Sequence, residues 1–174
     1  MYTVDDALFA MLHSCSEQLS SNRLVSYMYM YQLAGLDYQF RYQIASSGIK
    51  ARSINSFLNA VINEDKLEVI DGIVRLTTLG ELYYTSVPLT YAEWEKINDI
   101  KSCLDSLSDE ELYFVVLTDI VVSDTLKTYG VEGLMSQRTR ITTTLSNLSR
   151  EYSDENFDSA LKIIRKVKEG FDNE

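Results

Sequence analysis

The segment from residue 51 to residue 85 constrains the fold more than any other part of the chain. Its first part, residues 51–62, repeats apolar side chains at helical spacing, which predicts an amphipathic helix of about three turns. The apolar face of this helix must pack against another part of the chain. That face consists of Ile54, Phe57, Leu58, Val61 and Ile62.

A hairpin and another helix follow directly. Two short apolar runs, 67–70 and 73–76, are joined by Asp71-Gly72, and this pair favours a tight turn because both residues accept positive φ. Thr77 or Thr78 then caps the next helix. A helix, a two-stranded wing and a helix in this order form the second half of a winged helix-turn-helix.

The rest of the chain predicts a mainly helical protein. One proline and seven glycines in 174 residues favour helices with short connections. Val87-Pro88 marks a boundary between a winged-helix module, residues 1–87, and a C-terminal helical part, residues 88–174, packed on it. The predicted fold class is therefore mainly α, a winged helix-turn-helix with a two- or three-stranded wing plus a C-terminal helical bundle.

Periodicity and capping residues place the remaining elements. Thr90 is the expected cap of one helix, and Ser108 with Glu111 forms a capping box for another. Residues 37–44 alternate polar and apolar side chains, which predicts an extended segment, and residues 45–50 are expected to form the turn that follows it. The other predicted helices cover residues 3–19, 23–34, 79–85, 91–107, 108–127, 132–150 and 157–171.

Charge is unevenly distributed along the chain. The net charge of −10 argues against non-specific nucleic-acid binding, because a phosphate backbone attracts clustered Lys and Arg. Residues 23–63, however, hold four bases against Asp37 alone, a net of +3, whereas residues 64–125 hold fourteen acids and four bases, a net of −10. The basic residues thus gather before the wing, and the acids gather in the middle of the chain.

The sequence indicates no catalytic or metal site. His13 is the only histidine, and it forms no triad with Ser14 and Cys15 because neighbouring residues on a helix point in different directions. Cys15 and Cys103 form no CxxC pair. We therefore expect a non-enzymatic protein without a metal or a cofactor. No stretch reaches membrane-spanning length and no signal-peptide pattern is present, so we expect a cytoplasmic protein that contacts no membrane.

Three motifs resemble one known family. A helix with Leu24-Val-Ser-Tyr27-Met-Tyr29 precedes the aromatic segment Tyr38-Gln-Phe40-Arg-Tyr42, and the wing ends in Leu76-Thr-Thr-Leu-Gly80. In this order they are similar to the YwgA-like and SocA-like (Panacea domain) antitoxin group of winged-helix proteins. The turn at residues 46–53 keeps only the glycine and serine of the Tyr-Gly-Pro-Tyr-Ser sequence that is frequent in that group. The resemblance implies a prokaryotic or phage protein that binds a toxin or a defence component.

Twelve tyrosines suggest a surface for that partner. A helix with aromatic or Met side chains on several faces cannot bury all of them in a small module, and protein interfaces favour such side chains. The competing interpretation is that these residues form the core. The leading hypothesis is a protein-binding module of toxin-antitoxin or phage-defence type that recognises its partner through an aromatic and acidic surface. The predicted contact residues are Tyr27, Tyr29, Met30, Tyr31, Tyr38 and Tyr42.

The alternative is a dimeric winged-helix transcriptional regulator that binds DNA through the helix at residues 51–62. Asn side chains can read adenine and Arg side chains can read guanine in the major groove. The competing interpretation is a solvated polar face. A further alternative is an acidic inhibitor that mimics DNA with the surface of residues 93–111. The residues of the DNA-binding alternative are Arg41, Lys50, Arg52, Ser53, Asn55, Ser56 and Asn59.

Overall fold

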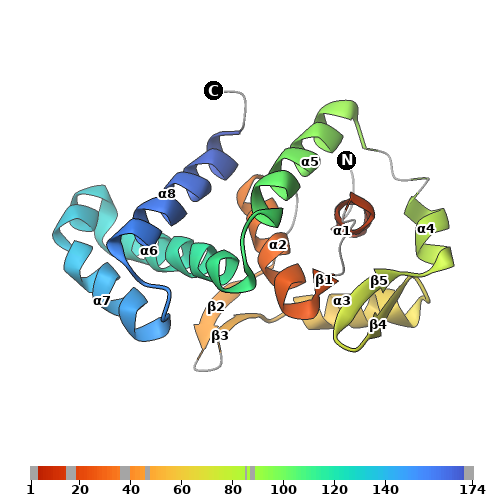
Figure 1. The fold of residues 1–174 in the computed structure, drawn as a ribbon, viewed down its shortest axis with the longest axis horizontal. Helices are drawn as coiled ribbons and strands as arrows, with labels where there is room; N and C mark the ends of the chain where they lie inside the picture. Colours follow the sequence, from red (N-terminus) through yellow and green to blue (C-terminus); the bar gives the residue numbers. More distant parts are fainter. Residues whose placement is uncertain are drawn as a thin grey trace.

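The computed structural model of the protein describes residues 4–14, 19–35, 40–45, 48–84, 86 and 89–170. Within these ranges the chain forms eight helices and five short strands, so the protein is mainly helical with two small antiparallel sheets (Figure 1). No helix in the described ranges is both long and apolar enough to cross a membrane. The predicted boundary at Val87-Pro88 lies outside the described residues.

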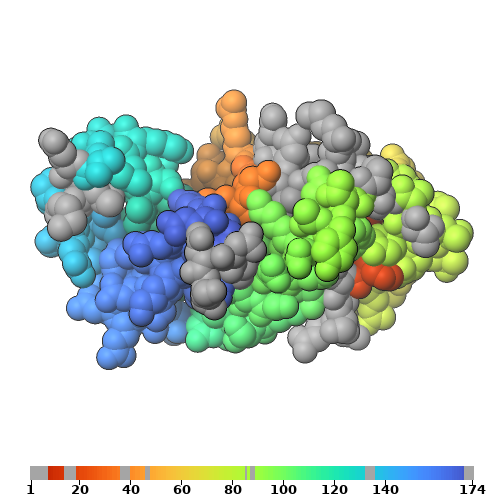
Figure 2. All heavy atoms as spheres, turned by 90° about the horizontal axis from the view of Figure 1, so that it is seen from above, coloured from red at the N-terminus to blue at the C-terminus, as the bar shows by residue number. Residues whose placement is uncertain are grey.

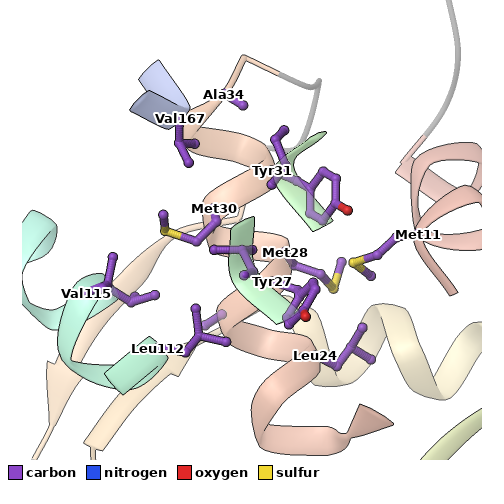
Figure 3. Packing of buried hydrophobic residues seen from close by; sticks show 14 of the residues in the cluster. Met11, Leu24, Tyr27, Met28, Met30, Tyr31, Ala34, Leu112, Val115 and Val167 are labelled. Atoms are coloured by element: carbon purple, nitrogen blue, oxygen red, sulfur yellow. The ribbon is translucent and has the colours of Figure 1, made fainter. Parts of the chain in front are cut away.

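Helix α2, Ser21–Leu33, lies at the centre of the molecule (Figure 1). It is packed against α5, Tyr91–Asp105, α6, Asp109–Ser136, and α8, Asp154–Glu169, and α5 also packs on α1, Val4–Ser14. Figure 3 shows α2 side chains pointing in opposite directions: Met30 points toward Val115 and Val167, and Met28 toward Met11. Helices from both sides of the predicted boundary therefore share one core.

A three-stranded sheet lies beside this core. It has the order β1-β5-β4, in which β1 is Leu19–Ser20, β4 is Leu67–Ile70 and β5 is Ile73–Leu76. Asp71 and Gly72 have φ values of 54° and 78°, which confirms the predicted tight turn between β4 and β5. Helix α3, Ile54–Asn63, packs on β4.

Helix α4, Thr78–Tyr84, follows β5. Its N-terminus is capped by Thr77, whose Oγ1 accepts a hydrogen bond from the Gly80 amide at 3.1 Å. The capping boxes of Thr90 with Glu93 and of Ser108 with Glu111 are also formed. These caps confirm the predicted helix starts, because they depend on residues only three positions apart.

A second hairpin was not predicted. Strands β2, Tyr42–Ala45, and β3, Gly48–Ala51, pair antiparallel between α2 and α3. The prediction of a simple turn at residues 45–50 is therefore wrong, although Ser46 and Ser47 lie outside the described residues. Gly48 takes a φ of +107°, which a glycine accepts at the turn. Strand β2 packs on α6, and this cover makes the pairing of the two strands favourable. Helix α3 consequently begins after Ala51 and not at it.

Two other predicted helices also differ in extent. Leu19 belongs to β1 and pairs with Val74, so it is not the end of the first helix, and residues 15–18 lie outside the described ranges. Helix α6 leaves helical geometry at Gly130, where φ is 71° and ψ is 179°, so its first segment ends close to the predicted residue 127 and a short second segment reaches Ser136. The helix predicted over residues 132–150 is shorter in the structure, since α7 is Arg138–Leu148 and residues 132–136 belong to the last segment of α6. Seen from above, α7 and α8 form one end of the elongated molecule and α4 the other, with α5 between them (Figure 2).

Candidate nucleic-acid interface

The predicted tyrosine surface is largely part of the core. Tyr27, Met30 and Tyr31 have 0% exposed side-chain surface. The hydroxyl groups of the two tyrosines are satisfied internally, since Tyr27 donates to Asp105 and Tyr31 donates to the Ile97 carbonyl at 3.0 Å. A side chain without exposed surface cannot contact a partner while the core stays closed. The prediction that these three residues form a protein-binding surface is therefore wrong.

The remaining residues of that predicted surface are divided. Tyr29 and Tyr42 are half-buried and pack edge to face, with ring centroids 4.8 Å apart at 88°. Burial raises the pKa of both hydroxyls, so both stay protonated well above pH 10. Tyr38 lies outside the described residues.

The Tyr29 hydroxyl takes part in a buried polar network that was not predicted. It donates to Asp119 at 2.6 Å, and Asp119, which is 2% exposed, also accepts from Lys168 Nζ at 2.7 Å. The network joins α2, α6 and α8. One signal in the sequence could have revealed it, because Asp119 is a single acid within the apolar run 114–122.

Helix α3 turns a polar face to solvent. Ile54 and Val61 are buried, whereas Asn55, Ser56 and Asn59 are exposed on the opposite face. These three residues make no side-chain hydrogen bond with a described residue, so their donors and acceptors are open to a ligand. The Ser53 side chain, also exposed, makes no capping hydrogen bond, which leaves the first amide groups of α3 open to an anion.

Uncompensated cations flank the start of α3. Lys50 and Arg52 are exposed, and neither forms an ion pair with a described residue. Residues 38–63 contain three bases and no acid, in a chain of net charge −10. The surface at the N-terminal end of α3 is therefore locally basic despite the acidity of the whole chain, whereas the exposed acids Glu64 and Asp65 follow its C-terminal end.

Two other bases of the basic segment are placed differently. Arg41 is exposed but lines a groove of about 540 Å³ between β2 and α6, which also contains Asp124 and Lys127. Arg23 is not free to bind a ligand. Its guanidinium pairs with Asp109 at 2.6 Å and donates to the carbonyl groups of Leu104 and Leu107, at the end of α5.

Several acids of the surface at residues 93–111 form hydrogen bonds or ion pairs within the protein itself. Glu93 and Glu111 accept hydrogen bonds from Thr90 and Ser108 in the two capping boxes, and those bonds lower the pKa of both carboxyl groups. Asp105 pairs with Lys101. This use of the acids gives no support to a surface that imitates a regular array of phosphates.

His13 is exposed. Its Nδ1 lies 3.2 Å from Glu81 Oε2, and its ring stacks on Tyr84 with centroids 3.8 Å apart. Within the described residues, no three His, Cys, Asp or Glu side chains gather as a metal site would require. The α3 surface is thus the best candidate for a functional site.

Comparisons of the chain with protein-family models, with curated proteins and with solved structures found no match. The function must therefore be inferred from the arrangement of the side chains themselves.

Proposed function

We propose that this protein binds duplex DNA through the exposed polar face of α3, as a winged-helix protein does. The chain order α1, β1, α2, α3, β4, β5 and the sheet order β1-β5-β4 support a winged-helix plan, with the β2–β3 hairpin inserted before α3. The observation that carries the proposal is that α3, the third helix of this plan, exposes Asn55, Ser56 and Asn59 beside Lys50 and Arg52.

The dimensions and chemistry of α3 suit the major groove. Its ten residues give a length of about 15 Å, and the groove is about 12 Å wide. Asn55 and Asn59 lie one turn apart, so both amides can face the same stretch of base edges. Asn can bind adenine and Arg can bind guanine with two hydrogen bonds each, and each such pair discriminates by about 1–3 kcal/mol.

The overall acidity of the chain is compatible with this function. The local field of an exposed basic patch acts on a nearby phosphate more strongly than distant charges, which salt screens over about 8–10 Å. Few bases flank α3, so the number of phosphate contacts is small. Affinity for DNA should accordingly fall only moderately with salt, and base contacts should contribute much of the specificity.

The protein-binding hypothesis, which the sequence favoured, loses much of its support, because Tyr27, Met30 and Tyr31 of the predicted contact residues are buried. A toxin or defence partner and a homodimer remain predictions from the sequence. DNA binding through α3 is the function that the exposed side chains favour.

The test is selection of duplexes from a random-sequence library by the whole protein, followed by affinity measurements on the selected duplex. We expect the double substitution Arg52→Ala with Asn55→Ala to weaken binding at least 30-fold, since two base contacts of about 1–3 kcal/mol each are lost. Both side chains are exposed, so the circular dichroism spectrum should not change.

A matched control removes the same side-chain types elsewhere. Arg165 on α8 and Asn147 on α7 are both exposed, and the double substitution Arg165→Ala with Asn147→Ala should leave the affinity unchanged. Failure of the library to yield any enriched duplex, or equal losses in the two double variants, would contradict the proposal.

A further inference from the structure

We infer that the β2–β3 hairpin, and not the β4–β5 hairpin, holds the DNA backbone beside α3. This inference rests on the proposed function, and it assigns the phosphate contacts of the same interface. In a winged helix the hairpin that follows the third helix is the expected backbone contact. Here the two hairpins differ in anchoring, charge and freedom to reach a ligand.

The β2–β3 hairpin is fixed to the body of the protein next to α3. Phe40, at its base, packs against Phe57 of α3 with ring centroids 5.5 Å apart. The Gln32 side chain holds the Phe40 backbone through two hydrogen bonds, of 3.1 and 3.2 Å. Tyr42 packs on Tyr29 of α2. The hairpin and α3 therefore present their exposed sides from one rigid framework.

The exposed side of this hairpin has donors that suit phosphate. Gln43 and Lys50 lie directly opposite each other in the strand register, and both are exposed. Arg52 follows two residues after Lys50, at the entrance to α3. Neither strand contains an acid. An ammonium group and an amide side by side can bind phosphate oxygens, and neither strand places a carboxylate between them.

The β4–β5 hairpin has the opposite character. Its turn contains Asp71, and the strand before the turn exposes Val69 and Ile70, at 45% and 46%. The Gly72 carbonyl at the tip accepts a hydrogen bond from the Ser21 amide at 3.0 Å, which ties the turn to the start of α2. Phosphate repels the carboxylate of Asp71, and the hydrogen bond to Ser21 keeps this turn close to α2. Figure 1 shows β2 and β3 at the lower edge of the molecule beside the start of α3, with β4 and β5 in front of α3 along the same edge.

Backbone contacts set the register of a protein on DNA but carry no sequence information. The β2–β3 hairpin would therefore raise the affinity for every duplex by a similar factor, while α3 discriminates among sequences. This division of roles gives each element a separate signature in binding measurements.

The experiment compares Lys50→Gln with Arg75→Gln. Arg75 lies on β5 and is exposed, so each substitution removes one exposed positive charge from one of the two hairpins. Affinities are measured by fluorescence anisotropy between 50 and 200 mM salt, on the duplex selected by the wild-type protein and on an unrelated duplex of equal length. One phosphate contact contributes about 0.9 to the slope of log affinity against log salt.

We expect Lys50→Gln to reduce that slope by about 0.9 and to weaken both duplexes by a similar factor, with Arg75→Gln close to the wild-type protein. A slope that changes in Arg75→Gln and not in Lys50→Gln would overturn the inference, and so would unchanged slopes in both variants. In those two outcomes the wild-type protein still binds the selected duplex, so the proposed function stands. If the wild-type protein binds no duplex, the proposed function itself fails and the inference fails with it.

Discussion

The pair Tyr29 and Tyr42 provides a sharp test of the packing between α2, β2 and α6. Both are half-buried tyrosines in edge-to-face contact, so replacing either by Phe keeps the ring and removes one hydroxyl. The Tyr29 hydroxyl donates to the buried carboxylate of Asp119. The Tyr42 hydroxyl is buried and has no hydrogen-bond partner among the described residues. The same chemical change should therefore have opposite consequences at the two positions.

The magnitudes follow from these partners. A hydrogen bond to a charged group contributes about 1.5–3 kcal/mol, so Tyr29→Phe should lower the free energy of unfolding by about 2 kcal/mol. For a chain of this length the Tm should fall by about 4–8 °C. Tyr42→Phe removes a polar atom that is desolvated without compensation, so the free energy of unfolding should stay the same or rise by up to about 1 kcal/mol.

Urea unfolding followed by circular dichroism measures both variants under the same conditions. Equal m-values would show that the comparison concerns stability and not a change in the unfolded state. A loss of stability in Tyr42→Phe as large as that in Tyr29→Phe would refute the assignment of partners. If the hydrogen bond is present, the loss of unfolding free energy in the double variant of Tyr29 and Asp119 should differ from the sum of the losses in the two single variants, because the two side chains share one interaction.

Two further predictions concern a close backbone contact and the alkaline limit of the fold. A Cβ added at Gly80 of α4 would overlap the carbonyl oxygen of Lys66, so Gly80→Ala should lower the free energy of unfolding by about 3 kcal/mol, and an unchanged Tm would disprove that close approach. Burial, assisted by Asp105 at Tyr27 and by Asp119 at Tyr29, raises the pKa of both tyrosines, so the unfolded chain loses these protons first as the pH rises. The stabilisation from these two tyrosines should therefore be intact below pH 10 and be lost above it. Absorbance at 295 nm should show Tyr27 and Tyr29 ionising only as the protein unfolds. Ionisation of all twelve tyrosines near pH 10 in the folded protein would contradict the burial of these two.

Features that depend on neighbouring residues were predictable from the sequence. The Asp71-Gly72 turn and the caps at Thr77, Thr90 and Ser108 each rest on two to four consecutive residues, whose backbone preferences and hydrogen bonds are local. The hydrogen-bond partners of these caps are set by chain geometry, so distant parts of the fold hardly affect them.

Features that depend on distant residues were not predictable. The hypothesis of a tyrosine surface assumed that a small module cannot bury a helix with apolar side chains all round. Helices α5, α6 and α8 come from the other half of the chain and provide that cover, so α2 becomes the centre of the core. A helix that is apolar on all sides is more often buried than exposed, and here that rule held.

The β2–β3 hairpin shows the same limit. The serines and glycine at residues 46–48 indicate a turn, but pairing of Tyr42–Ala45 with Gly48–Ala51 is favourable because α6 covers the inner side. The exposed face of α3, in contrast, follows directly from the apolar stripe on its other side. Among the bases, the role of Arg23 could not be inferred, since its partners at the end of α5 lie more than eighty residues away.

Site-specific photo-crosslinking to DNA shows directly whether α3 contacts the duplex. A photo-reactive amino acid replaces Asn59 on the exposed face of α3 in one variant, and Asn147 on the exposed surface of α7 in a control. We expect the Asn59 position to crosslink to the selected duplex and the Asn147 position not to do so. Crosslinking at position 147 but not at position 59, in protein that still binds the duplex, would contradict the assignment of α3 as the DNA-contacting element.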